Sequence, residues 1–304
     1  MLRNVARSLC CVPFAPHNSS EQCYAVNLKV SVVADSFWLI VKSERATSNP
    51  ETTRPKYHAA PELRAMLTCF APDLLPAHAI YQLSEEESKH AVRVLRLGVG
   101  HEIELLDGRG GRYRAAVADA NPKRCQLRIT AHEQVPPRSY FTHVAVAPTK
   151  NLDRMEWFVE KAVEVGVERI SFLRCARSER RELKLDRLEK IVISALKQSG
   201  QTWLPPLDDL TDFGAFIAAI APETTFIAHL EQGERTALAQ VASAGPGCCV
   251  LIGPEGDFTP TEIALALDRG IRPVTLGASR LRKETAALAA VFTVQLARSK
   301  TNEG

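Results

Sequence analysis

The chain has 304 residues, of which 45% are hydrophobic and 24% are charged, and its formal net charge is +3. The composition is that of an ordinary globular protein, and the length permits a full core and two domains. No apolar run approaches the ~18 residues that a membrane-spanning helix needs. Because the charge is only mildly positive, a nucleic-acid partner would have to be bound by a local basic patch.

The eight cysteines indicate neither a zinc site nor a disulfide framework. No Cys-x-x-Cys spacing occurs, and four of the cysteines form the adjacent pairs Cys10-Cys11 and Cys248-Cys249. Such spacing is typical of a reducing compartment. We therefore expect reduced thiols, a cytoplasmic protein and no metal site.

Residues 1–65 differ from the rest of the chain, with scattered Asn, Ser, Thr and Pro and no sustained period. They are expected to form a poorly ordered N-terminal extension. Residues 1–20 carry Arg3 and Arg7 without an acidic residue, which is weakly like an organelle transit peptide. The alternative is that Met66 is the natural start and that the upstream residues are an extension or a start-site artefact.

Residues 66–134 predict a small, mainly β domain. Glu102–Leu106 alternates between polar and apolar residues, and residues 107–111 form a glycine-rich hairpin turn. Further strands are expected at 113–118 and 126–130.

One helix interrupts this β pattern. Ser84 begins it with a capping box, and it runs to about Leu95 with Ala91, Val94 and Leu95 on its apolar side. Basic residues cluster on this helix and around the hairpin: Lys89, Arg93, Arg96, Arg109, Arg112 and Arg114. Singly, each is best interpreted as part of a solvated face. As a set, they can contact the phosphates of a nucleic acid.

After a linker at 135–138, strands and helices alternate up to about residue 300. This alternation predicts an α/β domain, 139–300, with a parallel sheet covered on both faces by helices. The strands are expected at 143–147, 170–173, Thr225–Ala228, 248–252 and 273–276, and the helices at 153–165, Leu185–Ser199 and from Pro260 to Gly270.

Two glycine-bearing turns follow the last two strands. Residues 253–256 read Gly-Pro-Glu-Gly, and Leu276-Gly277 forms the second turn. Between them, Thr259 to Glu262 predicts a helix start with a capping box and a proline at the first helical position. Parallel strands would place both turns at the carboxyl edge of the sheet, where open α/β sheets bind ligands. Neither a dinucleotide nor a P-loop fingerprint is present.

These segments resemble a known family. Leu-Ile-Gly-Pro-Glu-Gly-Asp-Phe (251–258) and Leu-Gly-Ala-Ser-Arg-Leu-Arg-Lys-Glu-Thr-Ala-Ala-Leu-Ala-Ala (276–290) are similar to the C-terminal signatures of the SPOUT-class methyltransferases that modify N3 of a uridine in 16S ribosomal RNA, the RsmE family. Ser-x-His-Ala-Val-Arg-Val-Leu-Arg-Leu (88–97) resembles the helix of the family's PUA-like domain. The resemblance covers about 66–298, which favours Met66 as the natural start.

The resemblance implies a SPOUT-type sheet with a trefoil knot, a homodimer and S-adenosyl-L-methionine as methyl donor. Glycines let the backbone approach a nucleoside closely. The residues expected at the donor are Leu230, Ile252, Gly253, Pro254, Glu255, Gly256, Leu276, Gly277, Leu281, Thr285 and Ala286.

Two departures from the family pattern stand out. Asp257 replaces a third glycine, and Ala278-Ser279-Arg280 replaces a Pro-Arg-Ile-like segment.

For the chemistry, Arg282 is expected to stabilise the anion that develops as N3 of the uridine loses its proton. Its structural alternative is a salt bridge with Glu284. Glu284 is the other expected catalytic residue, although Glu255, Glu284 and solvent are all open as proton acceptors. The expected RNA contacts are Arg93, Arg96, Lys150, Arg154 and Arg177.

The expected partner is 16S ribosomal RNA within the small ribosomal subunit. Two other functions are open. One is methylation of another RNA such as tRNA, and the other is a non-catalytic RNA-binding role in ribosome assembly.

Overall fold

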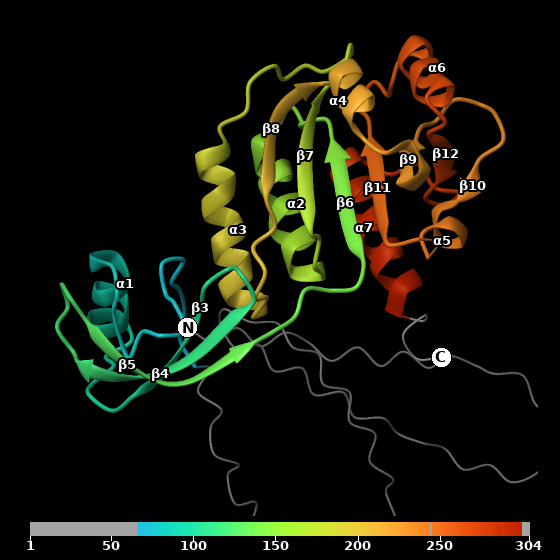
Figure 1. Ribbon diagram of the computed structural model, residues 1–304. Coiled ribbons are helices and arrows are strands. Elements are labelled where there is room, and N and C mark those ends of the chain that lie inside the picture. Colours follow the sequence, from blue (N-terminus) through green and yellow to red (C-terminus); the bar gives the residue numbers. More distant parts are fainter. Residues whose placement is uncertain (1–65, 244, 300–304) are drawn as a thin grey trace, which may run out of the picture. The chain divides into compact units, whose positions relative to one another are not determined.

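The computed structural model describes residues 66–243 and 245–299, and within them two β-sheets follow one another along the chain (Figure 1). The expectations for residues 1–65 lie outside the described residues. The first sheet has five strands in the order β1-β3-β4-β5-β2. Its strands are β1 (Thr68–Phe70), β2 (Ile80–Gln82), β3 (Glu102–Leu106), β4 (Gly111–Asp119) and β5 (Gln126–Gln134).

The predicted hairpin of the first sheet is confirmed. β3 and β4 pair antiparallel with Leu106 opposite Arg112. The turn is held by the Asp107 carboxylate, whose Oδ1 accepts hydrogen bonds from the backbone N–H groups of Arg109 (2.7 Å) and Gly111 (2.8 Å). β1 and β2 were not predicted, because three residues are too few to show an alternating pattern.

The predicted helix after Ser84 is correct at its start and wrong at its end. The Ser84 side chain caps α1 (Glu85–Lys89) as expected, but the chain then continues as a π-helical turn, η1 (His90–Val94). Ala91 is buried, whereas Val94 is 65% exposed and Leu95 is 43% exposed. The π turn adds a residue to each helical turn, so the side chains beyond it leave the face that a regular α-helix would bury.

The second sheet is entirely parallel, in the order β10-β12-β9-β11-β6-β7-β8. Its elements are β6 (Phe141–Val146), α2 (Leu152–Val165), β7 (Arg169–Arg174), α3 (Leu185–Ser199), β8 (Leu207–Asp212), α4 (Phe213–Ala219), η2 (Pro222–Thr224), β9 (Thr225–Ala228), β10 (Thr236–Ala237), α5 (Leu238–Val241), β11 (Gly247–Ile252), α6 (Pro260–Asp268), β12 (Arg272–Thr275) and α7 (Lys283–Ser299). Every strand and helix predicted in this part of the chain is present.

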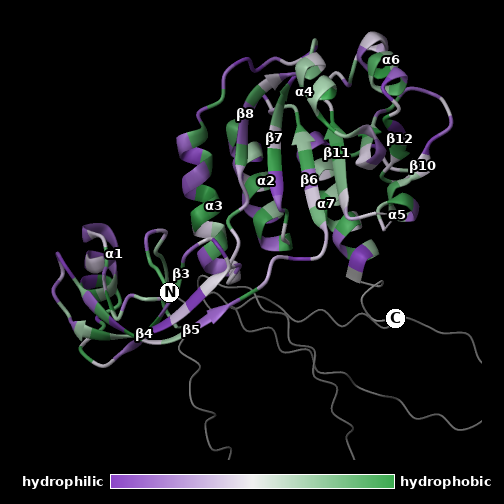
Figure 2. Ribbon diagram, viewed as in Figure 1, coloured by the Kyte–Doolittle hydropathy of each residue, from purple (hydrophilic) through white to green (hydrophobic). Residues whose placement is uncertain are grey.

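Helices cover both faces of this sheet, as the alternating pattern predicted. On one face, Val144, Val146 and other strand residues pack against α2, α3, α5 and α7. On the opposite face, Ala145 and Ala147 pack with α4 and α6. Figure 2 shows the hydrophobic colouring concentrated on the central strands, with hydrophilic residues on the outer side of α3. Within the described residues, no helix combines the length and the apolar character that a bilayer span requires.

Candidate active site

The carboxyl ends of four neighbouring strands meet at one edge of the parallel sheet. Ile252 of β11 lies opposite both Ala228 of β9 and Val146 of β6, and Ala228 lies opposite Val274 of β12. The segments that follow these strands are therefore neighbours. The strand ends and these segments carry the predicted donor residues Leu230, Ile252, Gly253, Pro254, Glu255, Gly256, Leu276 and Gly277. Leu281 lies just before α7, and Thr285 and Ala286 lie in its first turn.

A buried lysine joins three of these segments. Lys283, whose side chain is 3% exposed, donates from Nζ to Oε2 of Glu255 (2.9 Å) and to the backbone oxygen of Pro148 (2.9 Å). It thereby links the start of α7 to the turns after β11 and β6. Burial lowers the pKa of Lys283, although its hydrogen bond to Glu255 opposes this effect. Sequence reasoning missed Lys283, because its neighbours Arg282 and Glu284 carried the expected chemistry.

Glu255 is poorly suited to accept the proton from the base. Its Oε1 accepts a hydrogen bond from the backbone N–H of Lys150 (3.1 Å), and its Oε2 accepts one from Lys283. Partial burial acts to raise the pKa of this carboxyl, but these hydrogen bonds outweigh burial and leave the pKa below its ordinary value. A carboxylate held in its charged form is a weak base.

Arg282 and Glu284 do not form the salt bridge that was the structural alternative. Glu284 is buried, and its Oε1 lies 3.7 Å from Nε of Arg154. Arg282 is exposed, and its guanidinium has no hydrogen bond or ion pair with the residues that the structure describes. Of the two predicted catalytic residues, one is thus fixed inside the protein and the other is free to meet a substrate.

The three glycines of the turns have different physical roles. A Cβ on Gly253 would lie 3.0 Å from the Phe258 ring, so this glycine permits close packing. A Cβ on Gly256 would lie 3.3 Å from Arg177. Gly277 has a φ of +130° and open space around it, so here a glycine both permits the backbone conformation and leaves room for a ligand.

The basic residues predicted to bind RNA near this edge have partners inside the chain. Arg177 donates from Nη1 to the backbone oxygen of Gly256 (2.7 Å), and Nζ of Lys150 lies 2.9 Å from Oε2 of Glu179. Arg180 donates to the backbone oxygen of Lys150 (2.7 Å). These residues tie the loops after β6 and β7 to each other and to the glycine turn.

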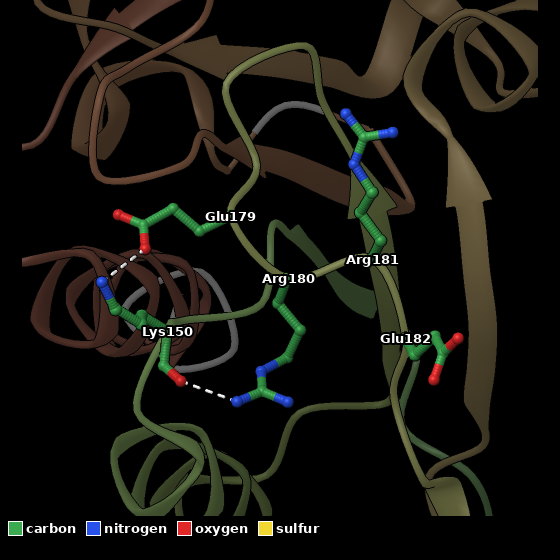
Figure 3. Close-up of a pocket in the computed structure, with 5 residues that line it drawn as sticks. All are labelled: Lys150, Glu179, Arg180, Arg181 and Glu182. Atoms are coloured by element: carbon green, nitrogen blue, oxygen red, sulfur yellow. Dashed lines mark hydrogen bonds and ion pairs between the residues drawn. The ribbon is translucent and has the colours of Figure 1, made fainter.

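A hollow of about 390 Å³ borders this loop, lined by Lys150, Glu179, Arg180, Arg181 and Glu182 (Figure 3). In the close-up, Lys150 and Arg180 are engaged with their neighbours, while the Arg181 side chain extends away from both glutamates. Among the residues that the structure describes, Arg181 forms no ion pair, so the hollow carries an exposed positive charge at its border.

On the small sheet, the basic residues fall into two groups. Arg109 donates to the backbone oxygens of Pro72 and Leu74, and Arg112 donates to the backbone oxygen of Gly200 (2.8 Å). In contrast, the exposed Arg93 and Arg96 have no side-chain partner among the described residues. These two predicted RNA contacts are thus available to a ligand.

Other residues near the two sheets serve packing. Trp203, which is 40% exposed, donates from Nε1 to the backbone oxygen of Val135 (3.1 Å). The described cysteines are buried and unpaired, and burial raises the pKa of the Cys248 thiol to about 12. In the part of the chain that the structure describes, no group of His, Cys, Asp and Glu is arranged to hold a metal ion.

Comparison with known proteins identifies the family. Residues 136–295 match the model of an RNA methyltransferase domain, and residues 83–130 match that of an RNA methyltransferase PUA domain. A ribosomal RNA small subunit methyltransferase E from Synechocystis is 32% identical over 219 residues, which cover 70% of this chain and 72% of that protein. The chain belongs to the ribosomal RNA small subunit methyltransferase E family.

Solved structures similar to this methyltransferase E chain have the same fold. One, from Porphyromonas gingivalis and described as a "probable rRNA-methyltransferase", is 36% identical with a TM-score of 0.72, covering 78% of this chain and all of that one. A ribosomal RNA small subunit methyltransferase E from Neisseria gonorrhoeae bound to S-adenosyl methionine is 27% identical with a TM-score of 0.69, covering 76% of this chain and 97% of that one. The predicted PUA-like β domain and parallel α/β fold are therefore confirmed.

Proposed function

We propose that this protein transfers the methyl group of S-adenosyl-L-methionine to N3 of a uridine in 16S ribosomal RNA. The observation that carries the proposal is the start of α7, where buried Lys283 is bonded to two turns and the exposed guanidinium of the adjacent Arg282 has no partner in the described part of the chain. An exposed guanidinium next to Lys283, which contacts the glycine turn through Glu255, supports this role for a chain in the methyltransferase E family.

The residues at the carboxyl edge fit a nucleoside donor without phosphates. Leu230 is 57% exposed, and Leu276 and Leu281 are half-buried, so apolar side chains are available to flank an adenine. The open backbone at Gly277 can approach the ribose. At the start of α7, the N–H of Ala286 already donates to the oxygen of Arg282 (2.7 Å), so the N–H groups before it are those free for the methionine carboxylate.

When bound, the donor supplies an electrophilic methyl group whose bond to sulfur breaks as the N3 lone pair attacks. The protein contributes mainly by holding both reactants in line. Arg282 favours the deprotonated base by stabilising negative charge on the carbonyl oxygens beside N3. With Glu255 occupied, Glu284 and solvent are the proton acceptors that the proposal leaves open.

RNA binding is proposed for two regions. Arg93 and Arg96 would contact phosphates from the PUA-like domain, proposed to span 66–134. Lys150, Arg154 and Arg177 would do so from the methyltransferase domain, proposed to span 139–300, although each also has a partner within the chain.

We further propose that the protein is a cytoplasmic homodimer whose C-terminal domain contains a trefoil knot. Support for a dimer comes from two helices that pack together, α2 and α7. Each exposes a large aromatic side chain, Trp157 (42%) and Phe292 (46%), of the kind that subunit interfaces bury.

Two measurements test the proposed function. Calorimetric titration with S-adenosylmethionine should show tight binding, and its absence would leave a non-catalytic assembly factor as the better explanation. Mass spectrometry of ribosomal RNA from a deletion strain should show the loss of one 3-methyluridine. An unchanged ribosomal RNA together with a missing tRNA modification would reassign the substrate.

A further inference from the structure

Asp257 occupies an unusual backbone conformation at the glycine turn after β11. Its φ is +63°, a left-handed value that is uncommon for residues other than glycine and that Asp tolerates better than most. Its backbone N–H closes the turn by donating to the oxygen of Pro254 (2.9 Å). The sequence therefore places a side chain where glycine would fit the backbone more easily.

The Asp257 carboxylate uses this position to join two strand ends. Oδ2 accepts a hydrogen bond from the backbone N–H of Leu230 (2.8 Å), and Oδ1 accepts one from the backbone N–H of Phe258 (2.8 Å). Leu230 is the second residue after the end of β9, so the carboxylate fastens the segment after β9 to the turn after β11. A glycine could adopt the same backbone but could not make these bonds.

The fastened segment carries a histidine that lacks internal partners. His229 is 9% exposed, and neither Nδ1 nor Nε2 has a hydrogen-bond partner among the described residues. Its backbone oxygen, in contrast, accepts a hydrogen bond from Nη1 of Arg235 (2.6 Å). Buried polar atoms without partners are costly, and such an atom is explained if a ligand supplies the missing partner.

We propose that Asp257 is a positioning residue that holds the segment after β9 at the methyl-donor site, and that His229 in this segment supplies a ring nitrogen to the donor. This inference rests on the proposed function, because it assumes that the donor binds at the carboxyl edge. The polar groups of the donor available to an imidazole are the ribose hydroxyls and the adenine edge.

Asp257→Gly tests the carboxylate alone, because it removes the side chain while the backbone conformation remains accessible. Glycine adopts this φ without strain, so the variant should fold as well as the parent, with a similar midpoint of thermal unfolding. Loss of the carboxylate should speed hydrogen exchange of the Leu230 amide and weaken binding of S-adenosylmethionine by about tenfold in calorimetry. Asp257→Asn, which retains one acceptor oxygen, should show an exchange rate and a donor affinity between those of the parent and of Asp257→Gly. Asp268→Asn, an exposed carboxylate at the end of α6, is the matched control and should match the parent.

His229→Phe tests the imidazole. It removes two unpaired buried nitrogens, so thermal stability should be unchanged or higher, whereas binding of S-adenosylmethionine and of its demethylated product should weaken by about tenfold. A variant that binds the donor as the parent does would overturn the role of His229.

The outcomes for Asp257 are equally distinct. Provided that the parent binds the donor, two results for Asp257→Gly would overturn the positioning role of Asp257. One is unchanged hydrogen exchange of the Leu230 amide, and the other is faster exchange with an unchanged donor affinity. A parent that does not bind the donor at all would overturn the proposed function itself.

Discussion

The basic residues at the carboxyl edge of the parallel sheet differ from those on the helical segment of the PUA-like domain. At the edge, Lys150, Arg154 and Arg177 each have a partner within the chain and hold loops together. On the helical segment, Arg93 and Arg96 are exposed, and their side chains have no partner within residues 66–243 and 245–299. Residues of the same type thus serve two purposes. Pairing within the fold shows which of these residues also hold loops together and which have side chains that are fully available to a ligand.

Arg282 is the exception at the edge, and its removal should have the largest effect. Arg282→Ala should lower the rate of methyl transfer by about 100- to 1,000-fold, because it removes the charge that stabilises the developing anion. Donor affinity should be unchanged. Single-turnover methylation and calorimetry measure the two quantities. Arg280→Ala, an exposed arginine two residues away, is the control, and an equal loss of rate there would contradict a specific role for Arg282.

Lys283→Met should affect stability as well as activity. The substitution removes the hydrogen bonds that join α7 to the turns after β6 and β11, so the free energy of unfolding should fall by about 2 kcal/mol. Denaturant titration measures this change. Lys161→Met removes a solvent-accessible lysine paired with Glu160 and Glu164 on α2 and should cost less than about 1 kcal/mol. Equal losses of unfolding free energy in the two variants would show that the burial of Lys283 adds nothing to its contribution to stability.

Replacing Arg93 and Arg96 together by glutamine should weaken RNA binding by about tenfold and reduce the salt dependence of the binding constant by about two charges. The methylation rate at saturating RNA should be unchanged, because neither residue lies at the carboxyl edge. Filter binding over a range of salt concentrations measures both effects. Lys89→Gln removes a lysine paired with Glu85 and should leave the salt dependence nearly unaltered.

Arg177→Ala should have the smallest effect on binding. It tests whether Arg177 mainly holds the glycine turn or mainly contacts RNA. If its main role is to hold the oxygen of Gly256, donor affinity should fall about fivefold with an unchanged salt dependence of RNA binding. A reduced salt dependence with unchanged donor affinity would instead place Arg177 with the RNA contacts.

Much of the fold could be predicted because the parallel sheet is buried on both faces. Its strands read as short apolar runs, as in 248–252, and α3 was predicted with its observed bounds. β8 escaped prediction because it is an edge strand rich in Asp, stabilised by ion pairs of Arg169 with Asp208 and Arg174 with Asp212. Such ion pairs join residues that are distant in sequence, so no local sequence pattern predicts them.

The meeting of the candidate-site segments at one edge of the sheet was predictable, but the contacts among their side chains were not. The glycine turns and the start of α7 could be found from sequence because strand ends carry ligands in this kind of sheet. The partner of Glu284 could not, since Arg154 lies far away in the chain. The same holds for Lys283 and for the carboxylate of Asp257, whose bonds depend on how separate segments meet. The π turn at His90 likewise follows from hydrogen bonding that residue preferences do not reveal.

The strand order has a consequence for how the protein is made. β6 pairs on one side with β11, which is synthesised more than a hundred residues later, as Val144 opposite Val250 shows. A growing chain therefore carries β6 with one open edge, a surface prone to mispairing, until β11 leaves the ribosome. Lys283, whose ammonium group joins the turns after β6 and β11, is translated after β11, so the proposed donor site can assemble only once α7 has begun to emerge.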